Sequence, residues 1–126
     1  MTNDLDDDVR AFHKKFGHPA PKFAVLPSDE VRAFRVKLIQ EECHELCEAL
    51  GRGSLSDIAA EAIDLLYVVI GTLVVCGLKV RPFWSLVQSA NMMKIPNPDG
   101  GKPLKPAGWT KPDCAGLIKT IRTLQP

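Results

Sequence analysis

Two short groups of acidic residues, Glu41-Glu42-x-x-Glu45 and Glu61-x-x-Asp64, lie in segments whose apolar residues recur at helical spacing. Carboxylates that face inward together are costly to desolvate and repel one another, so such a cluster needs a bound positive charge. A hard divalent cation that takes oxygen ligands, Mg²⁺ or Mn²⁺, is the simplest counter-charge. The pattern therefore predicts metal-assisted chemistry on a phosphate-bearing substrate.

The first acidic group shares a helix face with apolar residues. At about 100° per residue, Phe34 and Leu38 define an apolar stripe. Glu42 and Glu45 fall within this stripe, and Glu41 lies at its edge. The ordinary alternative for Glu-Glu-x-x-Glu in a helix is a solvated face, but here the stripe directs Glu42 and Glu45 inward.

The second acidic group lies on the next expected helix. Glu61 shares a face with Leu65 and Val68. Asp64 lies about 60° to one side of that face. Residues spaced i, i+3 stand side by side on a helix, and two antiparallel helices joined by a short loop would bring the two acidic groups together.

The elements that must position these acids are all expected to be helices. Periodicity and capping residues predict helices over about 5–16, 29–50, 58–76, 83–93 and 114–124. Ser28, Ser54 or Ser56, and Asp113 are the expected N-caps, while Gly51 and Gly53 are expected to stop the second helix. The fold class is therefore all-α, a bundle of four main helices with a short extra terminal helix.

The composition is that of one soluble domain. The chain has 126 residues, which we expect to form a single domain over 1–126, and its net charge is only +1. That charge gives no field for recruiting a nucleic-acid polymer or an anionic membrane. The apolar run 65–78 is shorter than the roughly 20 residues that span a bilayer. The acidic start lacks the features of a secretion signal, so a cytoplasmic location is expected.

The expected third helix is apolar on nearly every side between residues 65 and 75. A helix that is apolar all round must be surrounded, and a chain with four or five helices can scarcely surround one. We therefore expect part of this helix to face another subunit, in a homodimer or a homotetramer.

The cysteines offer a competing metal site. Cys43-His44-x-x-Cys47 resembles part of a zinc site, but Cys43 and Cys47 fall on the side of the helix away from the apolar stripe. No second Cys/His pair completes a tetrahedral set. The four cysteines of the chain are interpreted as reduced thiols.

The two acidic groups also resemble a family signature. Glu41-Glu42-Cys43-His44-Glu45, followed by Glu61-Ala62-Ile63-Asp64, is similar to that of the all-α nucleotide pyrophosphohydrolase superfamily. That group includes MazG-like proteins, dimeric dUTPases and phosphoribosyl-ATP pyrophosphohydrolases. Segments 59–69, 89–94, 101–103 and 108–113 add to the resemblance, which covers most of the chain from about residue 12 to residue 118.

The resemblance implies an activity and a set of roles. The activity is cleavage between the α and β phosphates of a nucleoside triphosphate, which gives the monophosphate and pyrophosphate and uses Mg²⁺. By position, the implied metal ligands are Glu42, Glu45, Glu61 and Asp64. Glu41 would orient or deprotonate the attacking water.

The C-terminal third resembles family segments that contact substrate. The resemblance implies phosphate or sugar contacts from Asn91 and Lys94, placed i, i+3 on the expected fourth helix. Lys102 lies in the substrate-proximal loop 95–113, where Lys105 and Trp109 could help it to form a lid over phosphate and base. The alternatives are a helix-terminal lysine favoured by the helix dipole and a solvated, flexible loop.

Other functions remain open at this stage. The same scaffold supports the phosphoribosyl-ATP step of histidine biosynthesis, and a non-catalytic nucleotide-binding regulator is a further alternative. A di-iron bundle would require Glu-x-x-His pairs, which neither acidic group has. Phe12, Phe16 and His13 of the first helix could help to wall a base pocket, although phenylalanines at helical spacing are more often core. The leading interpretation is a house-cleaning nucleoside triphosphate pyrophosphohydrolase.

Overall fold

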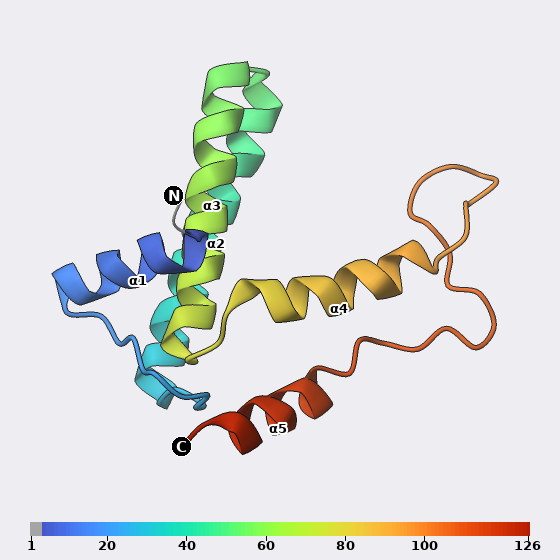
Figure 1. Cartoon of the computed structure of the whole chain (residues 1–126). Coiled ribbons are helices and arrows are strands. Elements are labelled where there is room, and N and C mark those ends of the chain that lie inside the picture. Colours follow the sequence, from blue (N-terminus) through green and yellow to red (C-terminus); the bar gives the residue numbers. More distant parts are fainter. Residues whose placement is uncertain (1–3) are drawn as a thin grey trace. The chain divides into compact units, whose positions relative to one another are not determined.

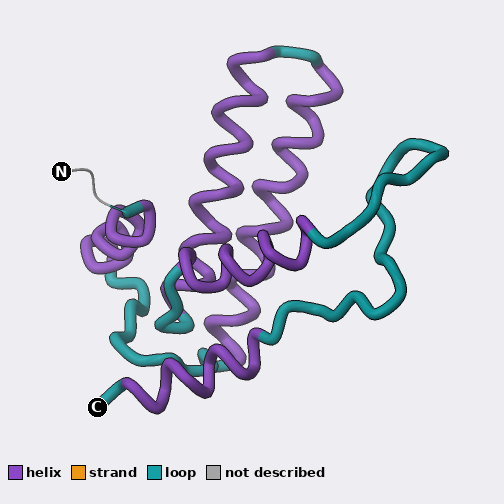
Figure 2. The backbone as a smooth tube through the Cα atoms, turned by 45° about the vertical axis from the view of Figure 1, so that its right-hand side comes forward, coloured by secondary structure: helices purple, strands orange, loops and turns teal. Residues whose placement is uncertain are grey.

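The computed structural model describes residues 4–126, which form five helices (Figure 1). These are α1 (Leu5–Phe16), α2 (Asp29–Arg52), α3 (Leu55–Val75), α4 (Val80–Met92) and α5 (Cys114–Leu124). The described residues contain no strand, and their one β pairing is an isolated bridge between Ile95 and Leu104 (Figure 2). The predicted all-α class is confirmed.

Three of the helices, α2, α3 and α5, begin at the residues that the capping pattern predicts. Ser28, Ser54 and Asp113 each accept a hydrogen bond from the backbone N–H three residues further on, at 3.3, 3.4 and 2.9 Å respectively. The end of α2 differs from the prediction, because the helix continues through Gly51. It ends at Gly53, whose φ of 72° is the left-handed conformation that glycine adopts at little cost.

The fourth helix also differs at both ends from its predicted range, 83–93. It begins at Val80, so Pro82 lies at its third position. That position tolerates proline, because the first N–H groups of a helix have no partner within it. The helix ends at Met92, which leaves Lys94 beyond its C-terminus rather than on it.

The chain forms two compact units, Met1–Leu78 and Lys79–Pro126. In the first unit α2 and α3 form an antiparallel pair, and α1 packs against α3. In the second unit α4 contacts α5. The organisation of residues 1–126 as a single domain stays a prediction.

The fully buried residues of the first unit are few. Val9 of α1 and Val74 of α3 are at most 2% exposed, and Ala49 is fully buried near the turn that joins α2 to α3. Two polar side chains, His13 of α1 and Arg35 of α2, are also buried. Burial of Val9 and His13 fixes α1 against the other helices of the unit.

Another face of α3 is apolar and exposed. Ile63, Leu66 and Val69 are each more than 40% exposed in the single chain. By length and composition α3 could cross a membrane, but one such helix is weak evidence because core helices pass the same test. The predicted contact with a second subunit concerns this exposed face.

In the second unit, the segment after α4 is held by Trp109. The indole N–H of Trp109 donates a hydrogen bond to the Ala90 carbonyl at 2.7 Å. The ammonium groups of Lys94 and Lys105 lie 5.5 and 4.9 Å from the centre of its ring. The loop is therefore packed against the C-terminal end of α4.

Gly71 of α3 has no side chain, and this allows the close approach of Arg35. A Cβ at Gly71 would lie 2.5 Å from Arg35 Nη2 and 2.9 Å from His13 Nε2. Gly71→Ala should therefore displace the buried guanidinium and lower the free energy of unfolding by about 1–2 kcal/mol. Gly51→Ala, at a helical glycine with open space, should raise it by about 0.5–1 kcal/mol. Urea denaturation of both variants checks this, and an unchanged Gly71→Ala midpoint would contradict it.

Candidate functional site

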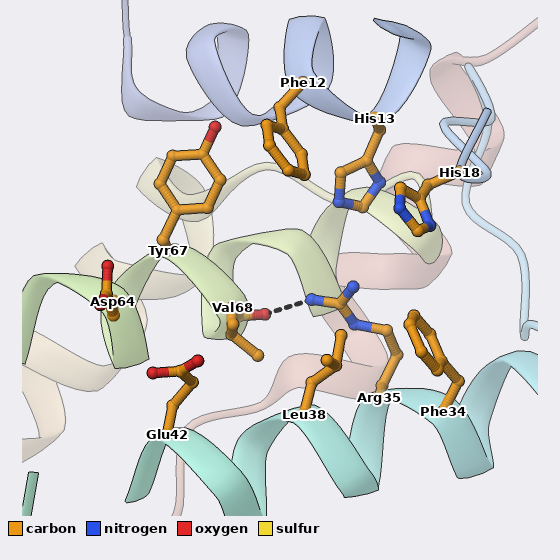
Figure 3. A pocket seen from close by; sticks show the side chains of 10 residues that line it. All are labelled: Phe12, His13, His18, Phe34, Arg35, Leu38, Glu42, Asp64, Tyr67 and Val68. Carbon is orange, nitrogen blue, oxygen red and sulfur yellow. Dashed lines mark hydrogen bonds between the residues drawn. The ribbon is translucent and has the colours of Figure 1, made fainter. Parts of the chain in front are cut away.

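The two acidic groups meet between α2 and α3. The carboxylate oxygens of Glu42, Glu45 and Glu61 lie within 4.8 Å of one another. Asp64 lies near Glu42, at the edge of a pocket that both side chains line (Figure 3). Glu41 is exposed and is not one of the three clustered acids. The predicted convergence of the acidic groups is therefore observed for three of the five residues, with Asp64 alongside.

The clustered acids raise one another's pKa values. Burial raises the pKa of Glu42, and the negative charges of Glu45 and Asp64 add to this effect. A hydrogen bond with Glu45 raises the pKa of Glu61, with burial and the charge of Glu45 as further causes. The protein therefore does not fully offset the negative charge that these carboxylates carry when all are ionised.

The donor set fits a hard divalent cation. The Oε2 atoms of Glu42 and Glu61 are buried and have no hydrogen-bond partner. None of the ion pairs found among residues 4–126 involves the clustered acids. Orphaned carboxylate oxygens without a nearby cation are the arrangement that a bound metal ion would satisfy.

A pocket of about 510 Å³ extends from the acids between α1, α2 and α3. A volume of this size accommodates a small-molecule ligand. The side chains that line it come from the three helices and from the turn after α1 (Figure 3). They are Phe12, His13, His18, Phe34, Arg35, Leu38, Glu42, Asp64, Tyr67 and Val68.

Aromatic rings form much of the pocket wall. The His18 ring is nearly parallel to the rings of Phe12 and Phe34, at centroid distances of 6.3 and 6.0 Å. Tyr67 meets Phe12 edge to face at 5.4 Å. Phe12 and Phe34 remain 41% and 44% exposed, so each has a ring surface available to a ligand. A flat aromatic group would find stacking partners here.

A comparison with protein-family models decides the affiliation of this site. Residues 9–91 match the model of phosphoribosyl-ATP pyrophosphohydrolase, and this range contains both acidic groups and every pocket residue. The chain belongs to the phosphoribosyl-ATP pyrophosphohydrolase family. A search of curated proteins found no match.

Membership in the phosphoribosyl-ATP pyrophosphohydrolase family establishes the reaction class. The family lies within the MazG-like all-α pyrophosphohydrolase superfamily, as the resemblance implied. Its members hydrolyse phosphorus anhydrides and generally use a divalent metal ion. The chain is therefore a pyrophosphohydrolase, and the acidic cluster is its candidate metal site.

The remaining predicted site residues lie in the second unit. Asn91 is exposed in the last turn of α4, at the end of the family match. Lys94 lies beyond the helix and stacks its ammonium group on Trp109. Lys102 is exposed, and its carbonyl accepts a hydrogen bond from Asn97 Nδ2 at 3.2 Å. Their contacts with substrate stay predictions.

Sequence analysis did not identify Arg35, His18 and Tyr67 as pocket residues. Arg35 could have been found, because it lies seven residues before Glu42 and next to it on the helix face, at the edge of the stripe that contains Leu38 and Glu42. His18 could not, since it follows α1 in a turn where periodicity carries no information. Phe12 and His13, considered only as possible pocket walls, do line the pocket.

The raised pKa values predict that metal-free protein loses stability as pH rises. In the ionised state the clustered acids repel in the native chain more than in the unfolded chain. The penalty therefore grows as pH rises from the ordinary Glu value of 4.5 through the raised values. Glu42→Gln/Glu61→Gln should melt above wild type at about pH 8 in chelator, and the difference should shrink near pH 4.5.

The control for this comparison is Glu30→Gln, at an exposed glutamate in the first turn of α2. Its melting temperature should show no pH-dependent rise over that of wild type between about pH 4.5 and pH 8. Adding Mg²⁺ should stabilise wild type but not the double variant. A double variant that melts below wild type at about pH 8 in chelator would contradict the repulsion argument.

Proposed function

We propose that the chain hydrolyses the α–β phosphate bond of ribo- or deoxyribonucleoside triphosphates. The products are a nucleoside monophosphate and pyrophosphate, the ion is Mg²⁺ with Mn²⁺ as a substitute, and the role is house-cleaning of the nucleotide pool. The observation that carries the proposal is the position of the acidic cluster at one end of an aromatic pocket. A nucleotide has the matching polarity, with phosphates at one end and a flat base at the other.

In this proposal Glu42, Glu45, Glu61 and Asp64 hold the metal ion. Mg²⁺ binds carboxylate oxygens at about 2.0–2.1 Å. The clustered oxygens, within 4.8 Å of one another, would have to move closer together to share one ion. The bound ion would neutralise phosphate oxygens and lower the pKa of water. By holding the ion, the four side chains would place the triphosphate at the acidic end of the pocket.

Glu41 is proposed to act on the attacking water. It is adjacent to Glu42 on α2 and is exposed, so a water molecule reaches it without displacing another side chain. Its carboxylate accepts a proton while the water oxygen bonds to the α-phosphorus and the bond to the pyrophosphate oxygen breaks. Pyrophosphate is the leaving group, and the pocket retains the monophosphate.

The proposal assigns substrate contacts to three residues of the second unit. Asn91, Lys94 and Lys102 would donate hydrogen bonds to phosphate or sugar oxygens. Lys94 also has a structural contact, because its ammonium group lies over the ring of Trp109. In this proposal, loop 95–113 closes over the bound substrate as a lid.

The proposed assembly is a homodimer or a homotetramer in the cytoplasm. The exposed apolar residues of α3, including Ile63, Leu66 and Val69, support association, because single soluble chains rarely expose such a row. Neither a membrane nor a nucleic-acid polymer is proposed as a partner. Chromatography of purified protein with light scattering measures the assembly directly.

A second candidate substrate is phosphoribosyl-ATP. The observation that favours it is the match to the phosphoribosyl-ATP pyrophosphohydrolase family, which is named after this substrate. Cleavage at the same α–β bond would then serve histidine biosynthesis. The acidic cluster would have the same role in both reactions.

A panel of nucleotides distinguishes the two candidates. Wild-type protein with Mg²⁺ should release pyrophosphate, not orthophosphate, as the first product from one or more nucleoside triphosphates. Phosphoribosyl-ATP belongs in the same panel and should be turned over at least about tenfold less efficiently, by kcat/KM. Release of orthophosphate first would overturn the proposed bond, and exclusive turnover of phosphoribosyl-ATP would favour the second candidate.

The roles of the acids predict a separation between chemistry and metal binding. Glu41→Gln should lower kcat by about 10²-fold or more while Mg²⁺ still binds, because only the proton acceptor is lost. Glu45→Gln/Asp64→Asn should lose Mg²⁺ binding in calorimetric titration. The control is Glu48→Gln, at a glutamate on the same helix that pairs with His44 and Arg52 instead. Equal loss of metal binding in Glu41→Gln would contradict its assigned role.

A further inference from the structure

Arg35 is a buried positive charge without an acidic partner among the described residues. Its side chain is 6% exposed, and no ion pair found between residues 4 and 126 includes it. Burial lowers its pKa, and no carboxylate acts in the opposite direction. Arginine is almost never buried unless it is paired, and here the charge of Arg35 has no ionic partner.

The guanidinium of Arg35 is held in place from one side. Nε donates to Thr72 Oγ1 at 3.2 Å, and Nη2 donates to the Val68 carbonyl at 2.6 Å. These bonds engage two of the five N–H donors of the group, which has no acceptor. Since Arg35 also lines the pocket, its remaining N–H groups can donate to a hydrogen-bond acceptor of a ligand there (Figure 3).

His13 supplies the complementary acceptor. Its Nδ1 lies 2.8 Å from the Pro19 carbonyl, which can only accept, so Nδ1 carries the proton. Burial lowers the pKa of His13, which keeps the ring neutral and leaves a lone pair on Nε2. Nε2 and Arg35 Nη2 both lie near Gly71 of α3, and the two side chains also line the pocket together.

This pair marks the end of the pocket away from the acids. Arg35 precedes Glu42 by seven residues on α2, which corresponds to about 10 Å along the helix axis. Figure 3 shows Glu42 and Asp64 at one end of the pocket and Arg35 with the two histidines at the other. With phosphates held at the acidic end, the far edge of a nucleobase would meet Arg35 and His13.

We infer that Arg35 and His13 make the pocket select oxo-bearing nucleobases. These are hypoxanthine, guanine, uracil and thymine, as opposed to adenine and cytosine. An oxo base presents an oxygen acceptor beside a ring N–H, which matches the donor of Arg35 and the acceptor of His13. An amino base presents N–H groups at the position of that oxygen, and these would face the N–H groups of the guanidinium. The inference rests on the proposed nucleoside triphosphate hydrolysis.

The test uses substrate pairs that differ in this one edge, ITP with ATP and dUTP with dCTP. Wild-type protein with Mg²⁺ should prefer the oxo member of each pair by at least about tenfold in kcat/KM. Hydrolysis of both members at similar or reversed efficiency overturns the inference and leaves the proposed function standing. No hydrolysis of any nucleoside triphosphate overturns the proposed function, and the inference with it.

Variants show whether Arg35 is the cause. Arg35→Met removes the donors but keeps an unbranched side chain, and it should reduce each preference to within about threefold by weakening the oxo substrates selectively. Arg35→Lys, which retains a charged donor, should retain part of the preference. Arg32→Met removes an exposed arginine one turn earlier on α2 and should leave the ratios unchanged.

A purely structural role for Arg35 predicts a different result. Both members of each pair would then lose efficiency equally in Arg35→Met, and that outcome would overturn the assignment. If Arg35→Met does not fold, calorimetric titration of wild type with IMP and AMP replaces it. Binding of IMP at least about tenfold tighter than AMP supports the inference, and equal binding overturns it.

Discussion

Repulsion among the carboxylates between α2 and α3 is the constraint on which the site depends. Glu42, Glu45 and Glu61 are brought within 4.8 Å by a helix pair that other residues hold together, including the fully buried Ala49. The packing of these helices thus opposes a local electrostatic cost, which appears as raised pKa values and as two orphaned oxygens. A site strained in this way is well suited to a cation, because binding it removes the cost instead of adding one.

The same helix pair gives the pocket its polarity. Two helical turns separate the acids from Arg35, so one end of the pocket attracts cations and the other donates hydrogen bonds. A ligand with a charged end and a flat, hydrogen-bonding end is therefore oriented before any residue acts on it chemically.

The features that were predicted correctly from the sequence are those that depend on interactions between residues close together in the chain. Caps at Ser28, Ser54 and Asp113 were correct because each needs only a side-chain oxygen and an N–H three residues on. The convergence of the acids followed from helical periodicity together with the short loop that makes the two helices antiparallel. The boundaries of α4 were wrong because Pro82 is tolerated anywhere in the first turn. The pocket was incompletely predicted, since the place of His18, in the turn after α1, depends on how the helices meet, and since Arg35 was overlooked at the edge of the α2 stripe.

The candidate metal site and the proposed association place coupled demands on α3. Glu61 and Asp64 face the site, whereas Ile63, Leu66 and Val69 leave an apolar face exposed in the single chain. A helix is rigid about its axis, so any rotation that improved the packing of one face would move the other. On the proposal that a second copy covers the apolar face, assembly would fix the rotation of α3 and with it the spacing of the carboxylates. The small core of the first unit makes such external support physically reasonable, because three helices alone bury few side chains fully.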